Sequence, residues 1–255
     1  MTDLSGRAAV VTGAGTGIGR AVALRLSRAG AAVALLGRTR TTLEAVAGEA
    51  KGEIFVHTVD VRDRAAVDEA FAAAAHRLGP LHLLVANAGT GGPDVVAGED
   101  RWDEIVRTNL DGAWFCSRAF LRHLAPGPAQ RHILVVSSCL ARFGVPGIAA
   151  YSAAKAGQLG LVRSLAAELA PRGVRVNAVC PGWVETGMAE DRMREIAEAS
   201  GTSYEEARRS LLAAVPLQRI SEPEEIAGLA LYLASDEAAG FTGQAFDLNN
   251  GAWMG

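Results

Sequence analysis

Short runs of apolar residues alternate with longer amphipathic stretches along almost the whole chain. The short runs are continuously apolar, which is typical of strands buried on both faces of a sheet. The longer stretches carry apolar residues at helical spacing and often end at glycine or proline. This pattern predicts strands at residues 8–12, 32–36, 54–59, 81–86, 133–137, 174–179 and 244–248, and helices at 17–29, 41–51, 64–78, 100–124, 149–170 and 223–234.

Strands that alternate with helices pair in parallel, because each helix carries the chain back to the same end of the sheet. Right-handed crossovers then produce a doubly wound α/β sheet, the Rossmann fold, with about seven strands and helices on both faces. No long linker or short repeat interrupts this alternation in the sequence. We therefore expect residues 1–255 to form a single domain.

One segment departs from the alternation. Residues 186–216, between the sixth predicted strand and the last predicted helix, are rich in Glu, Arg, Ala and Met. A strand-to-helix connection of this length is unusual and often covers an active site. We expect this segment to be a substrate lid, and its Met188, Met193 and Ile196 suit an acyl chain or a ring.

The composition narrows the class of protein. The chain has 255 residues, 49% of them hydrophobic, and a net charge of -3. The sequence has no basic run interleaved with aromatic residues, which argues against a nucleic-acid partner. Its apolar runs are too short to cross a membrane, and its first residues lack the pattern of a signal peptide. Three widely spaced cysteines do not suggest disulfides, so we expect a cytoplasmic protein.

The histidines and cysteines offer little chemistry of their own. The five histidines have no metal-ligand spacing, so we expect no metal site and interpret them as surface or strand-edge residues. Cys139 follows Ser138, but no histidine lies at a recognisable spacing to activate it. We interpret Cys139 as a small, partly buried thiol.

Tyr151 and Lys155 are the strongest candidates for catalysis. Their four-residue spacing places both side chains on one face of the helix predicted at 149–170. A phenol has a pKa near ~10, and a fixed ammonium nearby would lower it. The pair therefore resembles a tuned general acid and base. Ser138 follows a predicted strand, where its hydroxyl could meet the phenol across a substrate carbonyl.

A glycine-rich turn joins the first predicted strand to the first helix. Glycine permits a tight turn and lets backbone amides approach a pyrophosphate, and the helix N-terminus adds N–H donors. A turn without a ligand is the alternative, but the strand–turn–helix context favours a dinucleotide. The candidate contacts are Gly13, Gly15, Thr16, Gly17, Ile18 and Gly19.

The end of the second strand indicates which dinucleotide binds. An acidic residue there would accept a hydrogen bond from the ribose of NAD. The chain instead carries Arg38, with Thr39 and the weaker candidate Arg40 after it. A guanidinium suits a 2′-phosphate, so we expect NADP, as NADPH, in preference to NAD. The alternative is that Arg38 only precedes the next helix as a solvated residue.

Two further strand ends carry candidate cofactor contacts. Asp60, followed by Val61, ends the third strand, where a carboxylate would accept from an adenine amine or else cap the next helix. Asn87, Ala88 and Gly89 end the fourth strand. The Asn87 side chain can line the cofactor crevice, tie backbone groups of the turn together, or do both.

These motifs, in this order and spacing, resemble the short-chain dehydrogenase/reductase family in its compact single-domain branch. The resemblance covers nearly the whole chain and extends to Asn109, to Pro181 and Gly182, and to Thr186. Within the family, the pattern is most similar to 3-oxoacyl and polyketide ketoreductases. Family habit also implies a homotetramer.

The resemblance implies a role for each motif residue. Tyr151 would exchange the proton, and Lys155 would hold the nicotinamide ribose and lower the phenol pKa. Ser138 would polarise the carbonyl, and Asn109 would support a water chain that resupplies protons through Lys155. Pro181, Gly182, Val184 and Thr186 would shape the nicotinamide pocket.

Three functions follow as hypotheses. The first is an NADPH-dependent oxidoreductase that reduces a ketone, of the 3-oxoacyl or polyketide type, to a secondary alcohol with Tyr151 as general acid. The second is an NAD-dependent alcohol or hydroxy-acid dehydrogenase working in the oxidative direction, against which Arg38 argues. The third is a non-catalytic dinucleotide-binding sensor, which would have little use for Ser138, Tyr151 and Lys155 together.

Overall fold

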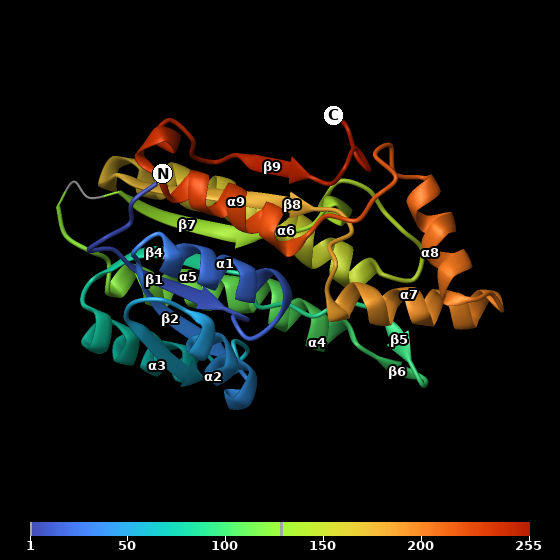
Figure 1. The fold of residues 1–255 in the computed structure, drawn as a ribbon, viewed down its shortest axis with the longest axis horizontal. Helices are drawn as coiled ribbons and strands as arrows, with labels where there is room; N and C mark the ends of the chain where they lie inside the picture. Colours follow the sequence, from blue (N-terminus) through green and yellow to red (C-terminus); the bar gives the residue numbers. More distant parts are fainter. Residues whose placement is uncertain (1, 128–129) are drawn as a thin grey trace.

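A seven-stranded parallel sheet forms the centre of the molecule (Figure 1). The computed structural model describes residues 2–127 and 130–255. The strand order is β3-β2-β1-β4-β7-β8-β9, and every neighbouring pair is parallel. This is a doubly wound α/β fold of the Rossmann type. Its strands are β1 (Ala8–Thr12), β2 (Ala32–Gly37), β3 (Ile54–Thr58), β4 (Leu81–Ala86), β7 (Arg131–Val136), β8 (Val174–Pro181) and β9 (Ala245–Leu248).

Helices cover both faces of this sheet (Figure 1). The short helix α4, the wide π-helical turn η1 and the helix α5 follow one another without a break. The bounds are α1 (Gly17–Arg28), α2 (Arg40–Glu49), α3 (Arg64–Leu78), α4 (Trp102–Val106), η1 (Arg107–Asp111), α5 (Gly112–Arg122), α6 (Ala149–Leu169), α7 (Gly187–Ser200), α8 (Tyr204–Ala213) and α9 (Pro223–Ala234), with short 3₁₀ turns η2 (Cys139–Ala141), η3 (Ala170–Arg172) and η4 (Asp236–Ala238).

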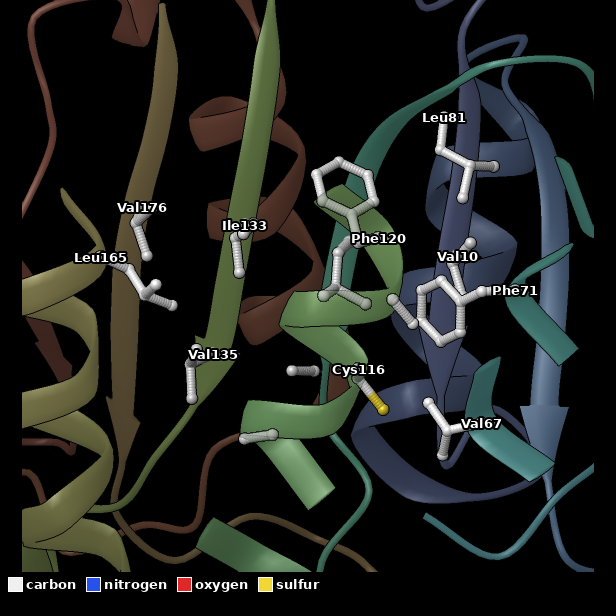
Figure 2. Close-up of a cluster of buried hydrophobic side chains, with 14 of the residues drawn as sticks. Val10, Val67, Phe71, Leu81, Cys116, Phe120, Ile133, Val135, Leu165 and Val176 are labelled. Atoms are coloured by element: carbon white, nitrogen blue, oxygen red, sulfur yellow. The ribbon is translucent and has the colours of Figure 1, made fainter. Parts of the chain in front are cut away.

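The core has two layers, one on each face of the sheet. In the first layer, Phe71 of α3 and Phe120 of α5 pack against β1, β4 and β7, and Leu165 of α6 packs near Val176 of β8 (Figure 2). The second layer joins the other face of the same strands to α1 and α9. Both faces are buried, which explains why the strand sequences are continuously apolar.

Most of the predicted elements are confirmed, and their ends shift by only a few residues. The predicted helix 100–124 is wrong in detail, because Asp100 lies in a small antiparallel hairpin of β5 (Val95–Val96) and β6 (Glu99–Asp100). The remaining helix contains the π-helical turn. A two-residue strand is too short to leave an alternation signal in the sequence, and a single wide turn leaves none in a helical pattern.

Residues 186–216 fold mainly as α7 and α8. Figure 1 shows both helices, with the β5–β6 hairpin, at the side toward which the arrows of β7, β8 and β9 point. Met193 is buried with Leu212 and Ile220 in a small cluster of its own. The expectation that Met193 presents itself to a substrate is therefore wrong, whereas Met188 is half exposed.

Two sequence expectations about isolated side chains have different outcomes. The histidines were expected at the surface or at strand edges, but His132 of β7 is 2% exposed and lies in the interior. All three cysteines are free and buried, as expected for Cys139. No helix within residues 2–127 and 130–255 is long and apolar enough to cross a membrane.

Candidate functional site

The carboxyl ends of β1 and β4 form the crevice at which the candidate site is built. The chain leaves β1 toward β2 on one side of the sheet, and later fills the other side from β4 onward. Connections from the two strands therefore diverge, and ligands of open α/β sheets bind at such a point. The glycine-rich turn after β1 and the Asn87 turn after β4 lie on its two sides.

The glycine-rich turn packs too tightly for side chains. Gly13 has a φ of +65°, and a Cβ built on it would lie 2.9 Å from Asn87 Nδ2. A Cβ on Gly19 would overlap the Gly13 carbonyl oxygen, and one on Gly17 would lie 2.9 Å from Thr186 Cγ2. Glycine is therefore required at these positions by the close approach of β4 and of the segment after β8.

The first turn of α1 is open to an anion. Thr16 is its N-cap but makes no capping hydrogen bond, and the first turn contains no acidic residue. The backbone N–H groups of Gly17, Ile18 and Gly19 have no hydrogen-bond partner within the described part of the chain. Unpaired N–H groups at a helix N-terminus suit a phosphate, so these residues fit the pyrophosphate of a dinucleotide.

Arg38 directly follows β2. The glycine-rich turn lies beside this strand end, because the Ala14 N–H donates to the Leu36 carbonyl at 3.1 Å. Arg38 is exposed and forms no ion pair with any residue that the structure describes. Thr39 follows as the N-cap of α2 and likewise makes no capping bond. A free guanidinium and a free hydroxyl are therefore available where an adenosine ribose would lie.

Asp60 is held by Arg62. Its carboxylate accepts from the Arg62 backbone N–H at 2.9 Å and forms an ion pair with the Arg62 guanidinium at 2.6 Å. This hydrogen bonding lowers the pKa of Asp60, and Arg38 contributes a smaller effect in the same direction. The helix-capping alternative for Asp60 is wrong, because Asp63 caps α3 by accepting from Ala65 and Ala66.

The Asn87 side chain ties the two turns together. Its Nδ2 donates to the Thr12 carbonyl at 2.9 Å and to the Gly13 carbonyl at 3.3 Å. The backbone N–H groups of Asn87 and Ala88 both donate to Thr12 Oγ1 at 3.0 Å. Asn87 therefore ties the backbone of the turn together, as one alternative predicted. Val61, another candidate contact, is buried against Gly112 of α5.

Ser138, Tyr151 and Lys155 gather beside the ends of β4 and β7. Ser138 Oγ accepts from the Leu140 N–H at 3.1 Å, which fixes the oxygen and leaves its hydrogen free to donate. Lys155 Nζ lies 5.4 Å from the centre of the Tyr151 ring. A Cβ built on Gly91, in the loop after β4, would lie 3.4 Å from the Tyr151 ring. The three side chains therefore lie close together, next to that loop.

Burial controls the proton affinities of the pair. It raises the pKa of the Tyr151 hydroxyl to about 12, although the neighbouring Ser138 hydroxyl opposes the rise. Burial also lowers the pKa of the Lys155 ammonium to about 8. The expectation that Lys155 lowers the pKa of Tyr151 is wrong for this structure. The ammonium instead donates to the Val136 carbonyl at 2.9 Å.

Asn109 lies in the π-helical turn η1, fully buried. Its Nδ2 donates to the Thr90 carbonyl at 2.7 Å and to the Ile105 carbonyl at 2.8 Å. Its Oδ1 has no hydrogen-bond partner among the described residues. A Cβ built on Gly89 would approach both Asn109 Oδ1, at 2.6 Å, and Lys155 Nζ, at 3.6 Å. Glycine at position 89 thus keeps space open between the amide oxygen and the ammonium.

The segment after β8 borders the glycine-rich turn, because Thr186 lies next to Gly17. Thr186 caps α7, because its Oγ1 accepts from the Ala189 N–H at 3.3 Å. A Cβ on Gly182 would lie 3.0 Å from Asn249 Cα, so Gly182 lets the C-terminal turn approach. Val184 forms a parallel bridge with Ser221. Pro181 ends β8, so all four residues expected at the nicotinamide end lie along one short stretch.

Two polar side chains that were not predicted from the sequence, Gln158 and Asp94, support this site from a distance. Gln158 of α6 is buried, and its Nε2 donates to the Asn109 carbonyl at 2.7 Å. Its place one turn after Lys155 on the same helix was a signal that could have found it. Asp94, which contacts the start of α6, lies 55 residues from its partner and leaves no local signal.

The fold and this site define a class of protein: an α/β protein that binds a dinucleotide at the switch point of its sheet. The family model described as enoyl-(acyl carrier protein) reductase matches residues 13–252. That match covers most of the chain. The chain belongs to the short-chain dehydrogenase/reductase family and is an NAD(P)-dependent oxidoreductase.

Individual relatives agree with this assignment. The chain is 41% identical to a protein of Streptomyces virginiae that is assigned as the ketoacyl reductase of the monensin polyketide synthase, over 98% of both chains. It is 33% identical to 3-oxoacyl-(acyl-carrier-protein) reductase FabG of Thermotoga maritima, over 97% of this chain and 98% of that one. A crystal structure of a variant of actinorhodin polyketide ketoreductase with NADPH superposes with a TM-score of 0.87 at 35% identity, covering 96% of this chain and 97% of that chain.

Proposed function

We propose that this protein reduces a ketone of the 3-oxoacyl or polyketide type to a secondary alcohol, with NADPH as its cofactor. The observation that carries the proposal is the grouping of Ser138, Tyr151 and Lys155 beside the strand ends at which a dinucleotide would lie. The names of the relatives support the substrate class. When bound, the dinucleotide supplies the hydride, and the protein supplies position and proton transfer.

Tyr151 is the proton donor in this proposal. A pKa of about 12 keeps its phenol protonated at neutral pH, which is the form that an acid needs at the start of a reduction. Ser138 orients the substrate, because its oxygen is fixed by Leu140 and its hydrogen is free to donate to a carbonyl. Together the two hydroxyls stabilise the negative charge that develops on the carbonyl oxygen.

Lys155 and Asn109 replace the proton that Tyr151 gives away. The space at Gly89 separates the Lys155 ammonium from the unpaired Asn109 Oδ1, and a buried polar atom without a partner is a place where water binds. A water chain through this space would connect Lys155 to solvent. The ammonium in turn holds the ribose of the nicotinamide in place.

Replacing Tyr151 tests the catalytic part of the proposal. We expect Tyr151→Phe to lower kcat by about 10²- to 10⁴-fold, the usual contribution of a general acid, while NADPH binding is retained. Tyr232→Phe is the matched control, because Tyr232 lies on α9 with a half-exposed ring next to Phe241. Steady-state turnover of a 3-oxoacyl thioester and a fluorescence titration with NADPH provide the two readouts. Near-normal turnover by Tyr151→Phe would refute the assignment.

Replacing Arg38 tests the choice of cofactor. Arg38→Asp removes the free cation at the end of β2 and adds a carboxylate that repels a 2′-phosphate, so we expect kcat/KM to fall for NADPH and to rise relative to it for NADH. Arg28→Asp makes the same charge change at the far end of α1 and serves as control. A wild-type preference for NADH would instead favour the oxidative dehydrogenase.

The lid, the assembly and the compartment remain part of the proposal. We assign residues 186–216 as the lid of one domain spanning 1–255, because Met188 Sδ would contact a Cβ built on Gly91 at 3.5 Å, next to Tyr151. We also propose a cytoplasmic homotetramer by analogy with the family. Light scattering coupled to size-exclusion chromatography measures the assembly directly.

A further inference from the structure

The helix that carries Tyr151 begins without a cap of its own. Ile148 occupies the N-cap position of α6 and has no polar side chain, and the first turn contains no acidic residue. The first backbone N–H groups of a helix have no partner inside the helix. Tyr151 is the third residue of α6, so it lies in the turn that would otherwise fray first.

Asp94 supplies this cap from another part of the chain. Its Oδ2 accepts from the Ala149 N–H at 2.7 Å, and its Oδ1 accepts from the Ala150 N–H at 2.9 Å. The Asp94 N–H also donates to the Gly147 carbonyl at 2.8 Å. A carboxylate that pairs with two N–H groups of a first turn also meets the positive end of the helix dipole. Three hydrogen bonds thus join the loop after β4 to the start of α6.

Arg101 fixes the other side of the same loop. Its backbone N–H donates to the Asp94 carbonyl at 2.8 Å, and its Nη1 donates to the Gly91 carbonyl at 3.2 Å. Glu104 holds the guanidinium through Nε at 2.9 Å. The loop is therefore held at both Gly91 and Asp94, and a Cβ on Gly91 would lie 3.4 Å from the Tyr151 ring.

We propose that Asp94 is a positioning residue for the reduction: its carboxylate caps α6 from outside the helix and holds Tyr151 beside Ser138 and Lys155. This role rests on the proposed function, because it acts through Tyr151. Asp94 does not reach the nicotinamide site through any of its hydrogen bonds. Its loss therefore affects the proton-transfer step and leaves binding of the dinucleotide at the glycine-rich turn in place.

Hydrogen–deuterium exchange tests the cap without reference to turnover. In Asp94→Ala, we expect the amides of residues 149–151 to exchange about fivefold faster or more, as loss of a helix cap predicts. Asp94→Asn keeps one acceptor oxygen and should give an intermediate rate. Asp100→Ala is the matched control, because Asp100 accepts from the Trp102 N–H at 2.8 Å and so serves the start of α4 instead. Unchanged exchange at 149–151 in Asp94→Ala would overturn the cap.

Steady-state kinetics tests the positioning. We expect Asp94→Ala to lower kcat about tenfold, because small displacements of a catalytic group are costly, with KM for NADPH unchanged and Asp94→Asn again intermediate. Faster exchange at 149–151 with a normal kcat would overturn the positioning role. Tyr151→Phe, measured in parallel, separates the two proposals, since a fully active Tyr151→Phe would refute the function and leave the exchange result intact.

Discussion

Lys155 shows how strongly one buried side chain depends on its surroundings. The ammonium is 4% exposed, donates to the Val136 carbonyl and faces the Tyr151 ring, with no carboxylate paired to it among the described residues. Burial without a counter-charge disfavours the charged form and lowers its pKa to about 8. The four-residue spacing could be seen in the sequence, but the depth of burial could not. For that reason the predicted direction of the Tyr151 pKa shift was wrong: burial raises this pKa, whereas the sequence suggested that Lys155 lowers it.

This lowered value has a consequence for activity. In the proposed mechanism the protonated ammonium holds the ribose hydroxyls and relays protons, so we expect kcat/KM for NADPH to fall as the pH rises through about 8. Tyr151, with a pKa of about 12, stays protonated over the same range and adds no second fall below about pH 10. A pH–rate profile from 6 to 10 measures this. A profile that is flat across the whole range would contradict the assignment of this role to Lys155.

The elements were predictable where one physical signal determined them. Buried parallel strands such as β4 leave continuous apolar runs, and α3 ends at Gly79, so both had the predicted bounds. The π-helical turn η1 was not predictable, because its wide turn is stabilised by side chains. Thr108 Oγ1 donates to the Glu104 carbonyl at 2.7 Å and Asn109 Nδ2 to the Ile105 carbonyl, four residues earlier in both cases. Gln158 of α6 also donates to the Asn109 carbonyl, and neither kind of bond changes the apolar periodicity of the sequence.

The candidate site shows the same division. The glycine-rich turn and the Tyr151–Lys155 pair are local patterns, so the sequence contained them. The partners of Asp94 and Gln158 lie 55 and 49 residues away, so only the folded chain brings them together. Residues that support a site through long-range contacts are therefore the part that sequence reasoning could not supply.

The junction of β1 and α1 carries a prediction of its own. Gly19→Ala places a methyl group over the Gly13 carbonyl oxygen and 2.5 Å from Asn87 Nδ2, so we expect a loss of about 1–3 kcal/mol of unfolding free energy, together with weaker NADPH binding. Gly48→Ala is the control, because Gly48 lies in the last turn of α2 and a Cβ there meets nothing within 4 Å. We expect it to gain about 0.4–1 kcal/mol. Urea denaturation compares both variants, and equal effects would contradict the packing argument.

At the scale of the whole molecule, the buried His132 couples stability to pH. Its Nε2 lies 3.1 Å from Asn177 Nδ2, whose amide also donates to the Phe241 carbonyl and accepts from the Gln244 N–H. These contacts make Nε2 an acceptor, so His132 must be neutral. Burial, with a smaller effect from Arg175, holds the pKa of His132 well below its ordinary value.

We therefore expect acid to weaken the fold. A base whose pKa is lower in the folded state favours unfolding when it binds a proton, so its contribution is complete above the unfolded pKa of about 6.5 and is lost as the pH falls below it. One such group accounts for up to about 1.4 kcal/mol per pH unit. Unfolding free energies measured at several pH values between 7.5 and 5 should fall less steeply in His132→Gln than in the wild type. His76 is exposed, so His76→Gln should show the same pH dependence as the wild type. If the unfolding free energy changed with pH equally in the wild type and in both variants, the coupling would be refuted.

The place of β1 in the sheet also sets an order of events during synthesis. Its two neighbours are β2, which follows within one helix, and β4, which begins only at Leu81. A growing chain shorter than this holds an apolar strand with one side unprotected against other chains. Ribosome-bound fragments that stop before Leu81 should thus leave this edge of β1 open to chaperones, and fragments in which β4 has emerged and paired should cover it.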